Sequence, residues 1–103
     1  MMITKAAVKI DYWNHNTKQE IIIPCHRHCD AFQILHDFGF IKGIDFREKE
    51  QGFLNEHGEF LNRIDAWREA KRSNQFTQEY KDELAQEIYH PATPRQLYSE
   101  DIW

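Results

Sequence analysis

Residues 25–36 hold the densest group of side chains in this sequence that could do chemistry. Arg27, His28 and Asp30 stand where we expect a helix to begin. Unpaired backbone N–H groups and the helix dipole favour an anion at such a place. The guanidinium of Arg27 can form two parallel hydrogen bonds to a phosphate or carboxylate group, and His28 can donate a further hydrogen bond or carry a proton. The pattern indicates a site for a phosphate-bearing ligand; the simpler interpretation is that Asp30 only caps the helix.

Metal and thiol chemistry fit the same segment less well. Zinc takes four N or S ligands, and Cys25 with His28 or Cys29 supplies only half of such a set, because the sequence has no second cysteine pair. We therefore expect no metal and no cofactor. Free cysteines are usually buried as small apolar residues, where their raised pKa makes them inert. A phosphoesterase centred on His28 stays open as an alternative, so enzymatic activity is undecided.

Length, composition and charge limit the other classes of function. The 103 residues, 41% apolar and 14% aromatic, suit one globular domain spanning residues 1–103. A formal net charge of −4 argues against non-specific binding to nucleic acid or to an anionic membrane. No apolar run approaches the ~18 residues of a membrane span, and no signal-peptide pattern opens the chain. We therefore expect a cytoplasmic protein with free thiols.

The first half of the chain predicts two strands and a helix. Residues 6–13 and 20–23 are rich in β-branched and aromatic side chains and form a plausible hairpin. The run Ile21 to Ile23 predicts a strand covered on both faces. The period then changes, and we expect a helix whose buried face carries five residues: Cys25, Cys29, Phe32, Leu35 and Phe38. Residues 41–51 are charged and are expected to form a connection, with room for one short strand.

The second half predicts another hairpin and two more helices. Residues 53–61 form the hairpin with Gly58 in the left-handed position, and Asn62 caps a helix that begins at Arg63. We expect Trp67 on that helix to be buried against the hairpin. A third, acidic helix opens at Thr77, with the narrow apolar stripe Tyr80, Leu84 and Ile88, which suits docking on the body or on another copy. The apolar tail 97–103 is expected to dock.

The predicted fold class is therefore α+β. It consists of a small, mostly antiparallel sheet made from two hairpins and packed by two helices, with a third helix near the C-terminus. A helix-dominated fold with marginal hairpins is the alternative.

Several segments resemble a group of small proteins from phages and mobile elements. Arg27-His28-Cys29-Asp30 is similar to an Arg-His-His-Asp segment of that group, and residues 51–63 to its Gln-Gly-Phe hairpin and the helix start that follows. Residues 74–76 are similar to its Gly-Gln-Ile element, and residues 97–102 to its Leu-Tyr-Ser-Glu-Asp-Leu terminus. The resemblance covers about residues 6–103 and implies a virus-associated protein without assigning a chemistry. Cys29 and Glu59 depart from the pattern, which has His and Arg there.

These observations predict a phage-type protein that binds, and sequesters, an anionic nucleotide-like small molecule, in order to counter a host defence or adjust a nucleotide pool. The expected ligand-binding residues are the polar ones of the helix start and of the resembling motifs: Arg27, His28, Asp30, Gln51, Arg63 and Gln75. Two alternatives remain. One is an inhibitor or adaptor whose acidic surface binds a host protein, and the other is a small His-dependent phosphoesterase. Self-association is left open.

Overall fold

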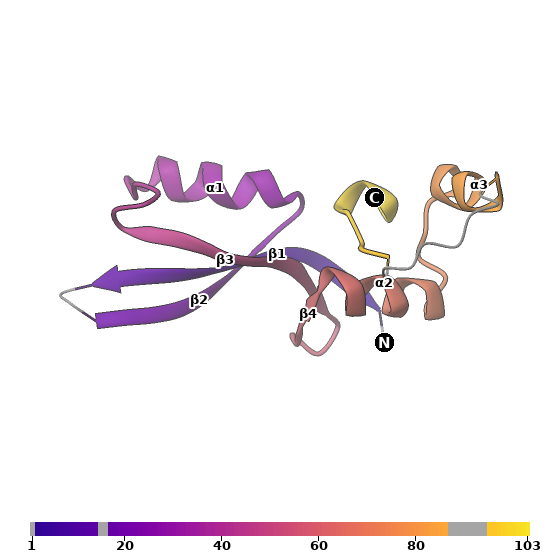
Figure 1. Cartoon of the computed structure of the whole chain (residues 1–103), viewed down its shortest axis with the longest axis horizontal. Coiled ribbons are helices and arrows are strands. Elements are labelled where there is room, and N and C mark those ends of the chain that lie inside the picture. The colour runs from indigo at the N-terminus through magenta and orange to yellow at the C-terminus, as the bar shows by residue number, and fades with distance from the viewer. Residues whose placement is uncertain (1, 15–16, 87–94) are drawn as a thin grey trace.

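The strands form one antiparallel sheet with helices packed against it, which confirms the α+β prediction (Figure 1). The computed structural model describes residues 2–14, 17–86 and 95–103. In chain order the elements are β1 (Ile3–Asn14), β2 (Thr17–Cys25), α1 (His28–Asp37), β3 (Phe46–Asn55), β4 (Phe60–Asn62), α2 (Arg63–Arg72), α3 (Gln78–Gln86) and the short 3₁₀ turn η1 (Ser99–Asp101). The strand order β2-β1-β3-β4 places β1 and β3 at the centre.

The two faces of β1 differ sharply. Ala6, Val8 and Ile10 are buried on the face that α1 covers, where they meet Ala31 and Leu35 of that helix. This alternation is what a sheet with one covered face requires. The opposite face carries charged pairs: Lys9 Nζ lies 3.8 Å from Glu20 and 3.9 Å from Glu50, and Arg47 lies 3.4 Å from Asp11. The sheet therefore has an apolar face under α1 and a salt-bridged face on the other side.

Two expectations for the strands were wrong. The segment 41–51 was expected to be a connection with room for one short strand, but the ten-residue strand β3 begins at Phe46 and pairs with β1, with register shifts between Ile3 and Lys5 and between Lys9 and Ile10. The strand was hard to recognise in the sequence because four charged residues follow one another, and Arg47, Lys49 and Glu50 all form ion pairs on the polar face, where a register shift breaks the alternation. The run Ile21 to Ile23 is not covered on both faces either, because β2 is an edge strand and Ile21 and Ile22 are exposed.

The buried face of the first helix also differs from the prediction. Cys25 still belongs to β2, where it pairs with Ala6, and α1 begins only at His28. The buried residues of α1 are His28, Ala31 and Leu35, which face the sheet. Cys29 and Phe38 are consequently exposed, against our expectation.

The hairpin of β3 and β4, with Gly58 at φ +76°, confirms the second predicted hairpin. Asn62 caps α2, as expected, by accepting a hydrogen bond of 2.8 Å from the Asp65 N–H. Trp67, however, is only half-buried, and it packs on Phe76 and Tyr80 instead of the hairpin. The expected apolar position Ile88 lies outside the described residues.

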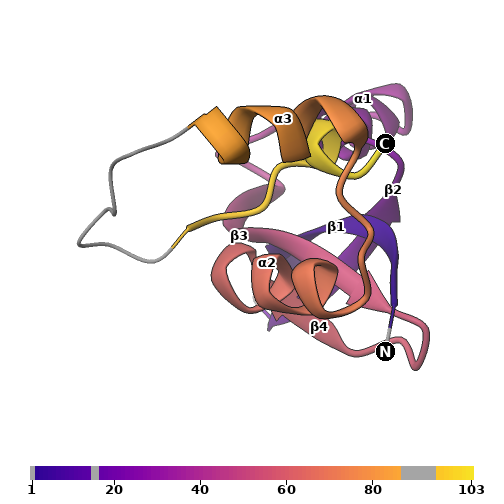
Figure 2. The same cartoon turned by 90° about the vertical axis from the view of Figure 1, so that its right-hand side faces the viewer.

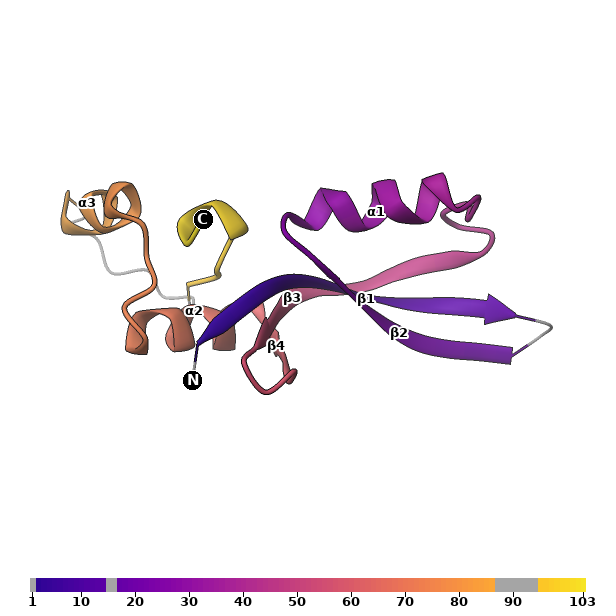
Figure 3. The same ribbon diagram turned by 180° about the vertical axis from the view of Figure 1, so that it is seen from behind.

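The docked tail confirms the prediction made for residues 97–103. Leu97 and Ile102 are buried, and Figures 1 and 3 show this segment in the space between α1 and α3. Figure 2 shows α2 on the other side of the tail from α3. The Thr77 N–H donates to Asp101 O at 2.8 Å, which ties the start of α3 to the tail. The tail is therefore part of the folded body and forms one wall of the region described next.

A candidate binding site beside the docked tail

Arg27 joins the start of α1 to the end of the tail. Its guanidinium Nη2 donates to Trp103 O at 3.0 Å, and its backbone N–H donates to Asp30 Oδ2 at 3.1 Å. Asp30 therefore caps the helix, as the simpler interpretation held. The Arg27 Nη1 atom is buried without a hydrogen-bond partner among the described residues. The other polar groups of Arg27 and Asp30 thus stabilise the fold, and the Arg27 Nη1 group is the donor that has no partner among the described residues.

His28 is buried under β3. Its Nε2 lies 2.7 Å from Gly52 O, and its ring stands edge-on to Phe53 with 5.0 Å between centroids. A carbonyl oxygen can only accept, so Nε2 carries a proton. Burial lowers the pKa of His28, and the nearby Arg63 charge adds to this, while the bond to Gly52 opposes it. The folded protein thus favours a neutral imidazole with one nitrogen already engaged.

Gly52 explains the Gln-Gly-Phe sequence. A Cβ atom at this position would lie 2.5 Å from Phe60 Cζ and would also collide with Leu61 O across the hairpin. Only glycine lets the β4 strand and the Phe60 ring come this close. The neighbours have separate tasks: the Gln51 amide points to Arg63, and Phe53 is fully buried in the core.

Arg63, the first residue of α2, holds the beginning of the tail. Its Nη1 donates to Leu97 O at 2.6 Å and its Nη2 donates to Gln51 Oε1. The guanidinium also lies 4.6 Å from the centre of the Tyr98 ring. Burial lowers the pKa of Arg63, and Tyr98, Glu100 and Glu48 partly offset this. Arg63 therefore stands half-buried in a polar setting with carboxylates nearby.

Gln75 lies apart from the other predicted site residues. Its Oε1 accepts from the Ile3 N–H at 2.7 Å and its Nε2 donates to Ile3 O at 2.8 Å. The amide thus makes the two hydrogen bonds that the backbone of a neighbouring strand would make, and it holds the start of β1 in place. The fold brings Arg27, His28, Gln51 and Arg63 to the region where the tail crosses the sheet, but it places Gln75 elsewhere.

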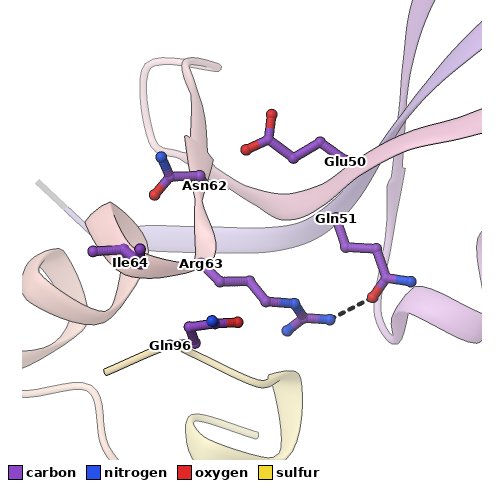
Figure 4. Close-up of a pocket in the computed structure, with 6 residues that line it drawn as sticks. All are labelled: Glu50, Gln51, Asn62, Arg63, Ile64 and Gln96. Carbon is purple, nitrogen blue, oxygen red and sulfur yellow. Dashed lines mark hydrogen bonds between the residues drawn. The ribbon is translucent and has the colours of Figure 1, made fainter. Parts of the chain in front are cut away.

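Two cavities flank this region. One, of about 300 Å³, is drawn in Figure 4 and is lined by Glu50, Gln51, Asn62, Arg63, Ile64 and Gln96. The other, of about 350 Å³, is lined by Thr4, Lys5, Pro24, Cys25, His26 and Trp103. There the rings of His26 and Trp103 stack with 5.3 Å between centroids. Sequence reasoning missed Asn62, Gln96, Lys5 and His26 as cavity residues; Gln96 reaches its cavity because the tail returns to the sheet, and Trp103 of the same tail closes the other cavity beside His26.

The remaining groups of the region provide neither a metal site nor a reactive buried thiol. Within the described ranges, no three His, Cys, Asp or Glu side chains gather closely enough to hold a metal ion. Burial raises the pKa of the Cys25 thiol to about 11, with a smaller contribution from Asp30. A thiol of that pKa is protonated near neutrality and is a poor nucleophile. Cys29 is exposed and also free.

Comparison with known proteins identifies a family for this chain but assigns it no activity. Neither the curated proteins nor the solved structures contain a match to this chain. No helix in the described part of the chain is long and apolar enough to cross a membrane. The segments that carry the resemblance to phage proteins meet around Gly52 and the tail, except for the Gln75 element. The family model for the phage T4 y16D protein matches residues 2–103, so the chain belongs to the phage T4 y16D protein family.

Proposed function

We propose that this phage protein binds a small anionic, nucleotide-like molecule in the cavity beside Arg63. The observation that carries the proposal is a half-buried guanidinium on the wall of a cavity of about 300 Å³ whose other walls include three amide side chains. A guanidinium has five N–H donors, and its bonds to Leu97 and Gln51 engage one hydrogen on each Nη atom. Donors therefore remain for a phosphate or carboxylate group.

The cavity walls suit a ligand with both an anionic and a polar neutral part. Gln51, Asn62 and Gln96 bring amide groups to the walls, and amides donate and accept hydrogen bonds as the edge of a nucleobase does. The Glu50 side chain points to the other side of β3 from Arg63 (Figure 4), where it lies 3.9 Å from Lys9 Nζ. A volume of about 300 Å³ is at the lower end for ligand sites, which favours a mononucleotide over a larger compound.

The predicted residues at the helix start take part indirectly. Arg27 and His28 hold the tail and β3 in place, and Gln96 reaches the cavity from the first residues of that tail. Membership of a phage family supports a ligand that the host makes, either a defence signal or a member of a nucleotide pool. Capture of such a molecule by an abundant small protein would lower its free concentration, which is the action we propose.

The test is a thermal shift titration against mono-, di- and cyclic nucleotides. A ligand that binds only the folded chain stabilises it by RT ln(1 + [L]/Kd), so even micromolar affinity raises the melting temperature at millimolar concentration. Gln96→Glu would place a negative charge at the cavity wall and should weaken binding at least tenfold. Gln86→Glu, at an exposed position of α3, adds the same charge elsewhere and should bind as the wild type does. An unchanged melting temperature with every nucleotide would contradict the proposal.

The second candidate is a protein-binding inhibitor or adaptor with an acidic surface. It is favoured by the side chains of Glu79, Glu83, Glu100 and Asp101, which line a hollow of about 310 Å³ between α3 and the tail. Such a surface would suit a basic partner. The third class, a phosphoesterase, would need a histidine that is free to exchange protons. The buried His28, with Nε2 held by Gly52, gives that class little support.

A further inference from the structure

The open edge of the sheet is apolar and uncovered. β2 is the first strand in the order β2-β1-β3-β4, and among the described residues it pairs only with β1, so its outer backbone groups have no partner strand in that part of the chain. Four large apolar side chains at this edge are exposed by 37–77%: Ile21, Ile34 and Phe38 on the face that α1 covers, and Ile22, which pairs with Lys9, on the opposite face. We call β2 with Ile21, Ile22, Ile34 and Phe38 the edge surface. Exposed apolar side chains along a free strand edge are normally avoided, because they invite pairing.

The geometry of α1 places two of these residues directly over the edge. Ala31 and Leu35 face the sheet, and Phe32 points toward β3, where its ring lies 6.4 Å from that of Phe46. At 3.6 residues per turn, Ile34 and Phe38 lie one turn apart on the flank opposite Phe32. β3 and β2 lie on opposite sides of β1, so this flank faces β2.

The β2 strand contributes to the same strip. Ile21 pairs with Ile10 of β1 and therefore points to the face that α1 covers. The helix runs antiparallel to β2, from His28 near Cys25 back toward the end of the sheet at which β2 begins (Figure 1). Ile21, Ile34 and Phe38 thus form one apolar strip that opens outward from the free edge.

We propose that the edge surface binds a second copy of this chain, with the two β2 strands pairing antiparallel about a twofold axis. The result is a continuous eight-stranded sheet, since each copy supplies four strands. A twofold axis perpendicular to the sheet puts both α1 helices on the same face. Ile34 and Phe38 of one copy then meet the same residues of the other, as an isologous interface requires.

The charges of β2 permit this pairing. Glu20 is the acidic residue of the strand, and it is already neutralised within its own chain by Lys9 and Lys49. Lys18 and Pro24 stand near the two ends of the strand, and a proline cannot donate a hydrogen bond. They confine the pairing to residues 19–23, where the isoleucines lie. The opposite edge, β4, has only three residues and leads directly into α2, so assembly stops at two copies.

The available area is sufficient for a weak but specific dimer. The five residues 19–23 present an edge about 17 Å long at ~3.3 Å per residue. Together with the four large side chains, its burial removes roughly 500 Å² from each copy, or about 1,000 Å² in total, which meets the lower limit of a specific interface. A dissociation constant in the micromolar range is therefore expected.

The test is the mass of the full chain in solution, measured by light scattering or sedimentation at about 100 μM. The wild type should show twice the 12.5 kDa of one chain. Ile34→Lys and Phe38→Lys should weaken the dimer by about 100-fold and give monomers with an unchanged circular dichroism spectrum, because both side chains are exposed. Met2→Lys adds the same charge at an exposed apolar position at the other end of β1 and should leave the dimer intact.

A cross-link tests the strand pairing itself. In a Cys29→Ser background, Ile21→Cys places a thiol next to the twofold axis, and mild oxidation should join two chains through it. A wild type that is monomeric at 100 μM overturns the proposal. So does a dimer that survives both lysine substitutions, or an Ile21→Cys variant that stays unlinked.

Discussion

The two ends of the sheet use polar and apolar residues in opposite ways. The molecule is 51 Å long and 27 Å wide. At the end where the tail docks, Arg27, His28 and Arg63 bond to main-chain carbonyls of residues 103, 52 and 97. At the far end, which carries the end of α1 and the loop after it, Phe38 and Ile44 are at least 70% exposed. The contrast shows that the arginine and histidine side chains stabilise the fold at one end, whereas large apolar side chains are exposed at the other. Exposed apolar side chains of this kind can bind a partner.

The largest effect that would sharpen this contrast is expected at Gly52. Gly52→Ala puts a methyl group against Leu61 O and the Phe60 ring, so the hairpin must open. We expect a loss of more than about 4 kcal/mol in the free energy of unfolding, measured by urea denaturation. Gly58→Ala is the control: nothing lies within 4 Å of a Cβ there, and the cost of its positive φ is about 1–2 kcal/mol. Similar losses in both variants would contradict the close approach at Gly52.

The next comparison uses one phenylalanine from each end. Phe53 is fully buried, so Phe53→Ala should cost about 3–5 kcal/mol through lost burial and the cavity left behind. Phe38 is 77% exposed, so Phe38→Ala should change the stability of the monomer by less than about 0.5 kcal/mol. Calorimetry at a protein concentration well below 1 μM avoids any contribution from self-association. A large loss for Phe38→Ala would show that the far end is part of the core.

A smaller effect is expected where the arginine fork holds the tail. Arg63→Lys keeps the charge but cannot bond to Leu97 and Gln51 together, so it should cost about 1–3 kcal/mol. Release of the tail should also speed its cleavage by carboxypeptidase. Arg68→Lys is the matched control, because Arg68 is exposed on the same helix and its pair with Asp65 at 3.6 Å adds little. Equal cleavage rates in both variants would mean that Arg63 does not anchor the tail.

Much of the fold was predictable because local signals agreed with it. Gly58 and Asn62 each meet a local backbone demand, namely a left-handed turn and a helix cap, and both were placed correctly. Leu97 and Ile102 were apolar enough to predict a docked tail. The length of β3 was underestimated because Arg47, Lys49 and Glu50 form ion pairs on one face and a register shift breaks the alternation of polar and apolar residues. Edge exposure of Ile21 was missed because strand order is a property of the whole sheet.

The candidate site was harder to predict than the fold. Gln51 and Arg63 were named, and they do line one cavity. Gln75 resembles them in type, yet its amide is bound to the backbone of Ile3, a pairing over 72 positions that no local pattern reveals. Gln96 reaches the same cavity only because the tail returns to the sheet. Long-range backbone contacts therefore decide which polar residues can meet a ligand.

The smallest effect concerns the proton balance of the docked end. Burial lowers the pKa of His28 below its usual 6.5, so the unfolded chain binds this proton more readily than the folded one. The corresponding stability is complete above about pH 6.5 and is lost as the pH falls through the lowered pKa. His28→Gln keeps a side-chain N–H for Gly52 O but cannot titrate. Urea denaturation of both proteins between pH 7.5 and pH 5 should therefore give a smaller loss of stability for the variant. If the two proteins lose the same amount of stability, the pKa of His28 is not lowered by folding, and water reaches this side chain in the folded protein.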